Sequence, residues 1–285
     1  MFKLTKLKTN NGYFIIFSLI FCFAYSCRSI GAYQTIQSMN QVLPILEQCD
    51  ATSLVIFDVD EVLIRPGDRI HLPKFFMNSP GKELKTNFEK KAGDRIEYIW
   101  SKVMLEAHRE LTEACLIPII DVLRQKGVKI IALTKLRSGP YGIIPSLEHY
   151  RFEQLIKLGI DFRSSFNFNY IFTELPFLYD NYPVFYNGII CTNDCSKGET
   201  LGAFLDRSNF QPQTIIFFDD LIENVKSVEQ EIQKRAIEFY GFHYCFPFPD
   251  ELDTKIAQFQ LNYLHEHEQW LSEQEAASIL FTINI

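Results

Sequence analysis

Three short apolar runs divide the chain, and a polar residue follows each of them. The runs cover residues 54–57, 128–133 and 214–218, and they are rich in β-branched and aromatic side chains. Runs of this length and composition predict strands that are buried on both faces, as in a parallel sheet. The chain is therefore expected to contain at least three central strands whose ends carry polar groups.

Helical periodicity occupies much of the sequence between and beyond these strands. Apolar residues recur at intervals of three and four positions, which is the pattern of a helix with one buried face. Gly127 and Gly159 each follow such a segment, where a glycine typically ends a helix. The alternation of helix and strand predicts an α/β fold, a Rossmann-like parallel sheet with helices on both faces. The expected helices cover about 36–46 with an interruption at Pro44, 96–114, 117–125, 147–158, 252–268, a segment from Leu201, a segment after Leu221 and a short one near Glu273.

Two stretches fit this pattern less well and are interpreted as insertions. Residues 66–113 open with a turn signal, Pro66-Gly67-Asp68, and begin in a long polar segment, so we expect a cap there. Residues 162–190 are rich in aromatic side chains, and Asn187-Gly188 between apolar residues predicts a hairpin that closes a flap. With both insertions included, residues 33–285 are expected to form one domain.

Residues 1–32 have the layout of a secretory signal peptide. Lys3, Lys6 and Lys8 precede an apolar stretch, and small residues follow it. The apolar stretch has about 13 residues, whereas a helix needs roughly 20 to span a bilayer. We therefore expect an exported protein, periplasmic or secreted, with no stable membrane span after processing. Cys27 follows a sequence that faintly resembles a lipobox, so a lipoprotein anchored through this cysteine is the open alternative.

The composition indicates a globular, acidic protein. Of the 285 residues, 47% are hydrophobic and 14% aromatic, which is ample for a sizeable core. The formal net charge of −7 gives no reason to expect nucleic acid as a partner. The cysteines beyond residue 32 form no regular framework. Cys191 and Cys195 are the nearest pair, and either a disulfide between them or buried thiols would fit.

The polar groups at the strand ends form the candidate site. In an open parallel sheet the carboxyl ends of the strands share one edge, where ligands bind. Alternation along the extended chain places Asp58 and Asp60 on the same side, so both would face one bound group. Clustered carboxylates repel one another unless a cation holds them, and Mg²⁺ is the expected cation for oxygen ligands. The groups expected to converge are Asp58, Asp60, Thr134, Lys197, Asp219 and Asp220.

These groups together predict metal-assisted phosphoryl transfer. A lysine and a hydroxyl group beside a metal suit the oxygens of a phosphoryl group. The substrate would be a small phosphorylated molecule. Its identity would depend on the cap, which has the least regular pattern of the chain.

The same residues, in the same order, resemble the four motifs of the haloacid dehalogenase-like (HAD-like) superfamily. The motifs correspond to Asp58-Val59-Asp60-Glu61-Val62, Thr134, Lys197 and Phe218-Asp219-Asp220. A narrower resemblance is to an exported bacterial family known by a domain of unknown function, DUF2608. That resemblance lies in residues 151–155, 158–162, 241–244, 259–260 and 270–272.

The HAD-like resemblance implies a role for each residue. Asp58 would be the nucleophile that forms an aspartyl-phosphate, and Asp60 would act first as general acid and then as general base. Thr134 would donate a hydrogen bond to a phosphoryl oxygen, and Lys197 would neutralise negative charge. The protein ligands of Mg²⁺ would be the carboxylates of Asp58, Asp219 and Asp220 and the backbone carbonyl of Asp60.

Three positions depart from the superfamily pattern or have no clear role in it. Asn224 stands where the superfamily often has a further acid or amide, and its role is open. Val62 replaces a common threonine, and Lys135 follows Thr134 where a small residue or asparagine is common. Neither replacement removes a reacting group.

The sequence thus predicts an enzyme, a Mg²⁺-dependent phosphatase that acts on a phosphomonoester through Asp58. A phosphomutase or a dehalogenase would use the same nucleophile. The alternative from another class is a catalytically inactive HAD-like module that binds or interacts outside the cytoplasm. The joint presence of all the reacting residues favours the enzyme.

Overall fold

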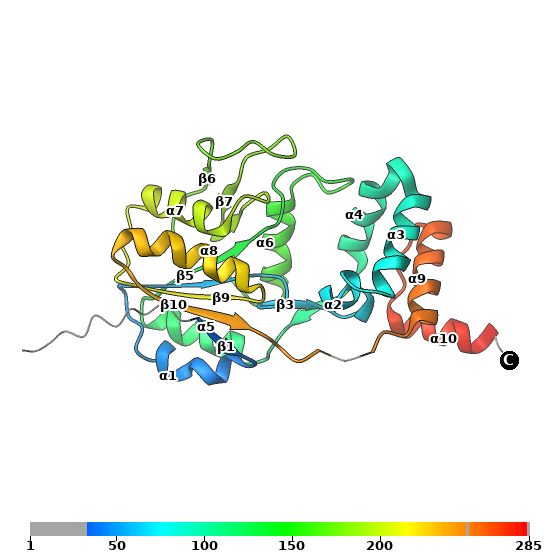
Figure 1. The fold of residues 1–285 in the computed structure, drawn as a ribbon, viewed down its shortest axis with the longest axis horizontal. Coiled ribbons are helices and arrows are strands. Elements are labelled where there is room, and N and C mark those ends of the chain that lie inside the picture. Colours follow the sequence, from blue (N-terminus) through cyan, green and yellow to red (C-terminus); the bar gives the residue numbers. More distant parts are fainter. Residues whose placement is uncertain (1–32, 249–250, 284–285) are drawn as a thin grey trace, which may run out of the picture.

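An eight-stranded sheet forms the centre of the computed structural model, which describes residues 33–248 and 251–283 (Figure 1). The first six strands in the spatial order below run parallel, and the last two are added antiparallel at one edge. The predicted α/β fold with a mostly parallel sheet is therefore confirmed. In spatial order the strands are β1 (Gln34–Ile36), β10 (Glu238–Tyr244), β9 (Thr214–Asp219), β2 (Ser53–Phe57), β5 (Lys129–Thr134), β8 (Ile189–Cys191), β7 (Val184–Tyr186) and β6 (Tyr170–Ile171).

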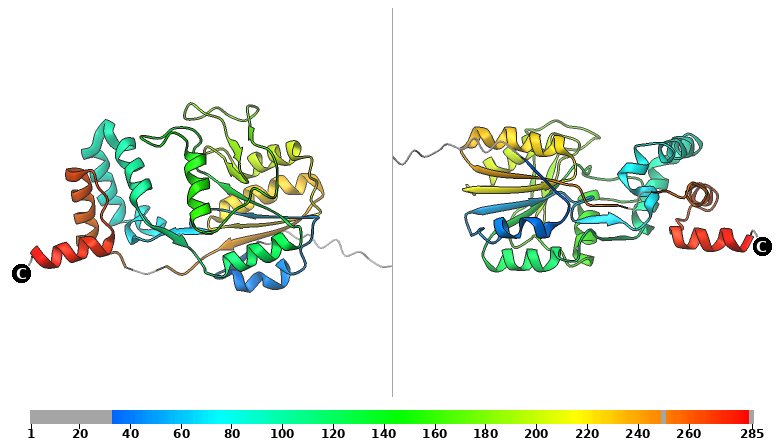
Figure 2. Two further views of the ribbon diagram at one scale, coloured as in Figure 1. Left: turned by 180° about the vertical axis from the view of Figure 1, so that it is seen from behind. Right: turned by 60° about the horizontal axis from the view of Figure 1, so that its bottom comes forward.

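Helices cover both faces of the sheet, as the right-hand view of Figure 2 shows. Along β2, Val55 and Phe57 face one helical layer and Leu54 and Ile56 face the other. Because this strand has no solvent-exposed face, its sequence is an unbroken apolar run. The first layer contains η1 (Met39–Val42), α1 (Leu43–Leu46), α5 (Leu116–Gln125) and α6 (Leu147–Lys157), and the second contains α7 (Lys197–Ser208) and α8 (Ile222–Ile232), which η4 (Gln233–Arg235) follows.

Three phenylalanine rings stack across the sheet near the ends of its central strands. Phe57 in β2, Phe218 in β9 and Phe242 in β10 are neighbours in register. The ring centroids of Phe57 and Phe218 are 5.0 Å apart, and those of Phe218 and Phe242 are 5.1 Å apart. Such aromatic pairs contribute about 0.5–1.5 kcal/mol each beyond the burial of their area. The stack therefore helps to fix the register of the strands just before Asp58 and Asp219.

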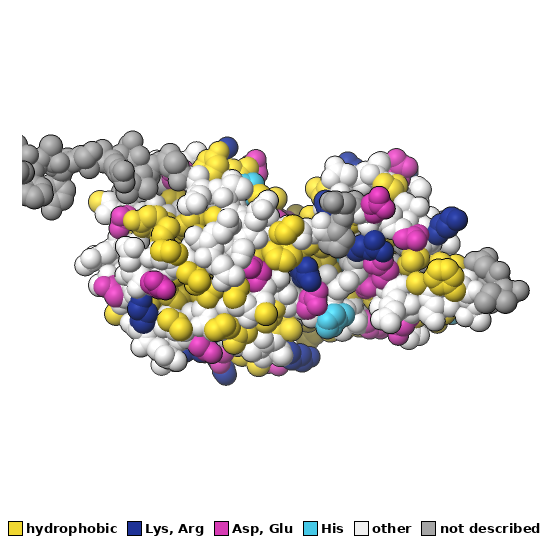
Figure 3. Space-filling view, turned by 90° about the horizontal axis from the view of Figure 1, so that it is seen from below, with side chains coloured by type: hydrophobic (Ala, Val, Ile, Leu, Met, Phe, Trp, Pro, Cys, Tyr) yellow, Lys and Arg dark blue, Asp and Glu magenta, His cyan; other side chains and the backbone are white. Residues whose placement is uncertain are grey.

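A second group of helices, here called the helical lobe, stands beside the sheet layer, and a notch separates the two in Figure 3. Its first part is inserted between β3 (Ile64–Pro66) and β4 (Arg109–Leu111), which pair as an antiparallel ribbon. Its second part follows β10, so two distant parts of the chain build the lobe. The lobe contains η2 (Arg69–His71), α2 (Pro73–Phe76), α3 (Gly81–Ala92), η3 (Gly93–Arg95), α4 (Ile96–Glu106), α9 (Thr254–His267) and α10 (Glu273–Ile283).

An apolar core and a set of hydrogen bonds hold the helical lobe together. Leu261 and Leu264 of α9 pack in one cluster with apolar residues of α3 and α4. Asp68 accepts hydrogen bonds from Nε1 of Trp270 at 2.8 Å and from the backbone N of Glu273 at 2.6 Å. The sequence predicts a cap made of residues 66–113 only, and the structure adds the two C-terminal helices to it.

The hairpin that the sequence assigns to a flap at residues 162–190 has its strands in the main sheet. The hairpin itself is confirmed, with Asn187 at φ 48° and Gly188 at φ 86° between β7 and β8. A Cβ atom on residue 188 would lie 2.7 Å from the carbonyl O of Phe162, so both the φ angle and the available space require glycine. Strand β8 then pairs in parallel with β5 and lies inside the sheet.

Two further elements differ from the prediction. The helix expected over residues 96–114 ends at Glu106, because the chain from Arg109 pairs with β3. The segment expected to begin a helix at Ile36 is instead the end of β1, which pairs with β10. The interruption expected at Pro44 is found, since a 3₁₀ helix ends at Val42 and α1 starts at Leu43.

The predicted signal peptide, residues 1–32, lies outside the described residues. Across residues 33–248 and 251–283, every helix is too short or too polar to cross a membrane. The cysteines in this part of the chain are all free thiols, so Cys191 and Cys195 form no disulfide in this structure.

Candidate active site

Asp58 stands at the carboxyl end of the central strand β2. Its backbone N donates to the carbonyl O of Phe218 at 2.8 Å, so the pairing with β9 continues one residue beyond the strand. The residue is 7% exposed, and its Oδ1 accepts a hydrogen bond from the backbone N of Val59 at 2.7 Å. Strands β5 and β8 lie on one side of β2, and β9 and β10 lie on the other. Ligands of α/β sheets bind at such a switch point.

Asp219 is the last residue of β9 and is fully buried. Its Oδ1 accepts hydrogen bonds from the backbone N of Leu221 and from Nδ2 of Asn224, both at 2.9 Å. Its Oδ2 accepts a hydrogen bond from Nζ of Lys197 at 2.6 Å. These bonds give Asn224, whose role is open from the sequence, a definite function, which is to orient Asp219.

Lys197 begins α7 and is 1% exposed. Its ammonium group lies 2.8 Å from Oδ1 of Asp58 and 2.6 Å from Oδ2 of Asp219. Burial alone would lower the pKa of this lysine, but the two carboxylates outweigh burial and raise the pKa above its usual range. Lys197 is therefore a buried cation that links the ends of β2 and β9.

The glycine after Lys197 allows the close packing that positions this lysine. A Cβ atom on Gly198 would lie 2.1 Å from the carbonyl O of Ser227 in α8. Helix α7 therefore approaches the backbone of α8 closely at its first turn. The backbone N of Gly198 also donates to Oγ of Ser227 at 3.0 Å, which fixes the two helices against each other.

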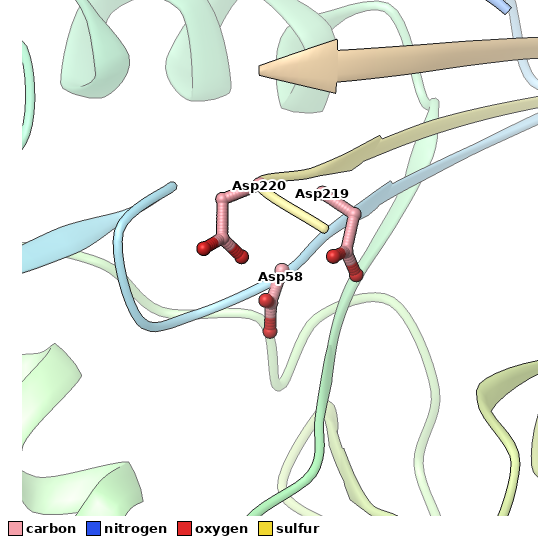
Figure 4. A group of neighbouring side chains, drawn as sticks. All are labelled: Asp58, Asp219 and Asp220. Carbon is pink, nitrogen blue, oxygen red and sulfur yellow. The ribbon is translucent and has the colours of Figure 1, made fainter. Parts of the chain in front are cut away.

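Asp58, Asp219 and Asp220 form an acidic group, in which each residue contributes a carboxylate oxygen within 4.8 Å of the others (Figure 4). Burial raises the pKa of Asp58 well above its usual range, and it raises the pKa of Asp220 to about 7, with neighbouring carboxylates adding to both shifts. The three carboxylates are balanced by one ammonium group, that of Lys197. The remaining negative charge favours the binding of a further cation. An oxygen-only donor set of this kind fits a hard divalent cation such as Mg²⁺.

Asp60 has a different environment from Asp58, although it is only two residues later. Its side chain is 42% exposed, and its carboxylate is not a member of the acidic group. Arg151 donates two hydrogen bonds to this carboxylate, at 3.0 and 2.9 Å, and Nη1 of Arg109 lies 3.9 Å from it. Partial burial opposes ionisation of Asp60, but the two guanidinium groups outweigh it and lower the pKa of this carboxyl.

A tight turn follows β2 and includes Asp60. The backbone N atoms of Leu63 and Ile64 both donate to the carbonyl O of Val59 at 3.0 Å. Glu61 within this turn has φ 65°, which an extended strand never has. That the side chains of Asp58 and Asp60 face one bound group stays a prediction. The backbone carbonyl of Asp60 as a metal ligand stays a prediction.

Thr134 ends β5 at the same edge of the sheet. Phe57 pairs with Ala132 in the register of β2 and β5, so Thr134 lies two positions beyond the end of β2. Its Oγ1 accepts a hydrogen bond from the backbone N of Leu136 at 3.3 Å. This bond uses a lone pair of the hydroxyl oxygen and leaves the O–H donor for another partner.

A comparison with protein family models gives a match for this chain. The family model described as "Protein of unknown function (DUF2608)" matches residues 35–277. The chain belongs to the DUF2608 family. The matched range runs from β1 into α10, so the sheet layer and the helical lobe both lie within the family domain.

The relatives of this DUF2608 protein include proteins of Rickettsia and Chlamydia species. An uncharacterized protein of Rickettsia prowazekii is 23% identical over 239 residues, which cover 83% of this chain and 86% of the relative. An uncharacterized protein of Rickettsia felis is 35% identical over 141 residues, 48% of each chain. A protein of Chlamydia trachomatis named "Putative outer membrane protein" is 24% identical over 249 residues, 86% of this chain and 88% of its own. No solved structure matches this chain significantly.

Arg151 is the main residue at the site of this DUF2608 protein to which the sequence assigns no role. It is buried on the face of α6 that also carries Leu147 and Leu155. A charged residue at a buried position of an apolar helical face needs an ionic partner. That pattern is the sequence signal for Arg151, and Asp60 is the partner that the structure supplies.

Two more polar side chains of the DUF2608 chain lie beside the acidic group. Glu61 is buried, and burial raises its pKa to about 8, with the adjacent carboxylate of Asp60 adding to the shift. Nε2 of His243, on β10, lies 3.0 Å from the carbonyl O of Asp220. His243 therefore contacts the backbone of Asp220, the residue after β9.

Proposed function

We propose that this DUF2608 protein is a Mg²⁺-dependent phosphatase that hydrolyses a small phosphomonoester through an aspartyl-phosphate on Asp58. The observation that carries the proposal is the Lys197 ammonium group, 2.8 Å from Oδ1 of Asp58, inside an acidic group whose oxygens lie within 4.8 Å. A carboxylate attacks a phosphoryl group only when positive charge offsets their repulsion. The site offers one fixed cation, the ammonium group of Lys197, and carboxylate oxygens that could bind a second, Mg²⁺.

The positions of the motif residues support the HAD-like resemblance. Asp58 and Thr134 stand at the ends of β2 and β5, and Asp219 stands at the end of β9. These strands follow one another in the sheet as β9, β2 and β5, with β8 next to β5. Lys197 opens the helix after β8 and reaches the same point. The catalytic roles proposed below come from this resemblance.

In the first step, a carboxylate oxygen of Asp58 attacks phosphorus, and the bond from phosphorus to the leaving oxygen breaks. The leaving oxygen keeps the bonding electron pair and takes a proton from the acid form of Asp60. Lys197 offsets negative charge on Asp58 and on the phosphoryl oxygens. The free O–H of Thr134 donates to one of these oxygens.

In the second step, water attacks phosphorus and the bond between Asp58 and phosphorus breaks. Asp60, now a carboxylate, takes a proton from this water, and inorganic phosphate and free Asp58 are the products. The pairing with Arg151 at 3.0 and 2.9 Å favours the ionised form of Asp60 that this step uses. Asp60 thereby regains the proton that it gave in the first step.

The acidic group supplies the candidate ligands for Mg²⁺. The carboxylates of Asp58, Asp219 and Asp220 would hold the ion, together with the backbone carbonyl of Asp60. When bound, the ion would supply positive charge to the phosphoryl oxygens. Asn224 keeps Asp219 oriented toward Lys197.

We also propose that the mature protein works outside the cytoplasm, in the periplasm or the medium. The first 32 residues have the layout of a signal peptide, with three lysines before an apolar stretch. Two chlamydial relatives are named "Putative outer membrane protein". A lipid anchor on Cys27 is the variant of this proposal in which the protein stays at a membrane surface.

The test is hydrolysis of aryl phosphates and a panel of phosphorylated metabolites by the chain that starts at residue 33. We expect activity with Mg²⁺, loss of activity with EDTA, and a kcat lower by about 10³-fold or more in Asp58→Asn. Asp206→Asn is the matched control, because this exposed carboxylate pairs with Arg235 far from the site. An acid-quenched, hydroxylamine-sensitive phosphate label should be present in wild type and absent from Asp58→Asn.

Absence of hydrolysis across the panel, or equal rates for wild type and Asp58→Asn, would overturn the proposed function. The catalytically inactive HAD-like module would then be the better description of this protein.

A further inference from the structure

The carboxylate of Asp60 is held more firmly than its partial exposure suggests. Nη1 and Nη2 of Arg151 bind its two oxygens in a fork at 3.0 and 2.9 Å. The Arg151 side chain is only 5% exposed, so water screens this pair weakly on the arginine side. A bidentate pair of this kind fixes the plane of the carboxylate as well as its position. Arg151 therefore decides where Asp60 points.

Arg151 is also the first residue of a hydrogen-bond chain that leads away from the site. Its Nη1 donates to Oε1 of Gln154 at 2.9 Å. Nε2 of Gln154 donates to the hydroxyl of Tyr150 at 3.0 Å, and this hydroxyl donates to the carbonyl O of Met104. Met104 belongs to α4 of the helical lobe, while the other residues belong to α6 beside the sheet.

The donors and acceptors along this chain leave one consistent direction. Arginine only donates and a carboxylate only accepts, whereas glutamine and tyrosine do both. The Tyr150 hydroxyl accepts from Gln154, so its single hydrogen is free to reach Met104. Loss of the contact with Met104 would remove an acceptor from the whole chain. Hydrogen bonds in such networks strengthen one another, so an end contact influences the far end.

The lobe and the sheet layer are not tightly packed where this chain crosses between them. A cavity of 410 Å³ lies there, lined by Met104 of α4, Tyr150 and Gln154 of α6, and Arg109 of β4, among others. Arg109 approaches Asp60 from β4, at the base of the lobe. With little side-chain packing at this point, polar contacts carry much of the link between the lobe and Asp60.

We propose that Arg151 is a positioning residue for Asp60, and that the chain Arg151–Gln154–Tyr150–Met104 couples the orientation of Asp60 to the position of the helical lobe. The catalytic part of this inference rests on the proposed function. The structural part, the coupling of Asp60 to α4, does not. The position of the lobe would thus determine the orientation of Asp60, the proposed general acid and base.

The structural part is tested by hydrogen exchange, which needs no activity. Tyr150→Phe removes the hydroxyl that joins Gln154 to Met104, and Asp60→Asn weakens the other end of the chain. We expect amides in the last turn of α4 to exchange at least about 3-fold faster in both variants. Tyr240→Phe is the matched control, because it removes a hydroxyl bonded to Glu238 at the amino end of β10. Rates in α4 that equal those of this control would overturn the coupling.

The catalytic part is tested by a double-mutant cycle. Arg151→Ala should lower kcat by about 10–100-fold, a share of the 10²–10⁴-fold that a general acid–base contributes, with a smaller change in KM. In the Asp60→Asn background the same substitution should cost nothing further. Guanidinium chloride below denaturing concentrations should restore part of the lost kcat in Arg151→Ala but none in the double variant. Arg235→Ala, which removes the pair with Asp206, is the control and should keep full activity.

An equal loss in both backgrounds, or no recovery with guanidinium, would overturn the role of Arg151 while the phosphatase itself stands. A wild type that hydrolyses no phosphate overturns the proposed function and the catalytic part together. In that case the hydrogen-exchange result alone decides whether α4 and Asp60 are coupled.

Discussion

The sheet edge and the helical lobe bury polar groups in opposite ways. At the sheet edge, charges compensate one another, with Lys197 between Asp58 and Asp219. In the lobe, His71 lies 4.6 Å from the ring of Trp270, and its buried Nε2 has no hydrogen-bond partner among the described residues. Charge balance therefore determines the properties of the first region. Neutral packing determines those of the second.

The two regions also differ in how the chain assembles them. The site residues of the sheet edge sit at the ends of neighbouring strands, so the register of one sheet brings them together. The lobe depends on contacts such as the one between Asp68 and Trp270, which are 202 residues apart. Substitutions at the sheet edge should therefore change chemistry and charge balance. Substitutions in the lobe should change local stability.

The largest effect is expected from Lys197→Met. This change leaves Asp58 and Asp219 buried without their shared cation, which should cost about 3–5 kcal/mol of unfolding free energy. Hydrolysis of aryl phosphates should fall by about 10³-fold or more, because the loss removes charge stabilisation beside the nucleophile. Urea denaturation followed by circular dichroism measures the first effect. Lys234→Met, at an exposed lysine that pairs with Glu231, should change neither quantity, and similar curves for the two variants would contradict the comparison.

A smaller effect at the sheet edge is expected from Gly198→Ala. The new methyl group would meet the backbone O of Ser227 at 2.1 Å, so α7 must shift and carry Lys197 with it. Overpacking of this kind should cost about 1–3 kcal/mol and lower kcat. Gly202→Ala in the same helix is the matched control, because the atoms nearest to its methyl would belong to the flexible side chain of Glu231, with Oε1 at 2.6 Å, and not to backbone. If both variants have the same unfolding free energy, close helix packing does not position Lys197.

The smallest effect tests the neutral interior of the lobe. Burial, and secondarily Arg109, lower the pKa of His71 from 6.5 to about 3. The unfolded chain therefore binds a proton at this residue below pH 6.5 that the folded chain does not bind. Stability falls as pH falls from 6.5 toward 3, by at most about 1.4 kcal/mol per pH unit.

His71→Gln should remove this contribution, so its unfolding free energy should decline less between pH 6 and pH 5 than that of wild type. The expected difference is about 1 kcal/mol in urea denaturation at the two pH values. His265→Gln, at an exposed histidine of α9, is the control and should follow wild type. Parallel pH profiles for wild type and His71→Gln would show that His71 is protonated in the folded lobe.

The sequence predicts the sheet edge better than it predicts the lobe, and the reasons are physical. A strand buried on both faces requires an unbroken apolar run, so residues 54–57, 128–133 and 214–218 stand out. Strands β1 and β4 have three residues each, which is too short for a periodic pattern. Helical periodicity shows that α9 buries one face, but it does not show that the partner is α3.

Within the site, the sequence predicts the residues but not all of their environments. Asp58, Asp219 and Asp220 converge because strand ends converge in any parallel sheet, and Lys197 joins them from the start of α7. The backbone turn that starts at Val59 and the positive φ angle of Glu61 cannot be read from side-chain alternation. Tertiary contacts alone bring Arg151 of α6 to Asp60.

The ribbon of β3 and β4 and the segment after β10 connect the sheet layer to the lobe three times. A lobe joined to the sheet layer by one connection could rotate about it, whereas three separate connections restrict that rotation. The pairing of β3 with β4 adds backbone hydrogen bonds between two of these connections. The orientation of α4 relative to the sheet layer is therefore set by these connections as well as by the hydrogen bond from Tyr150 to Met104.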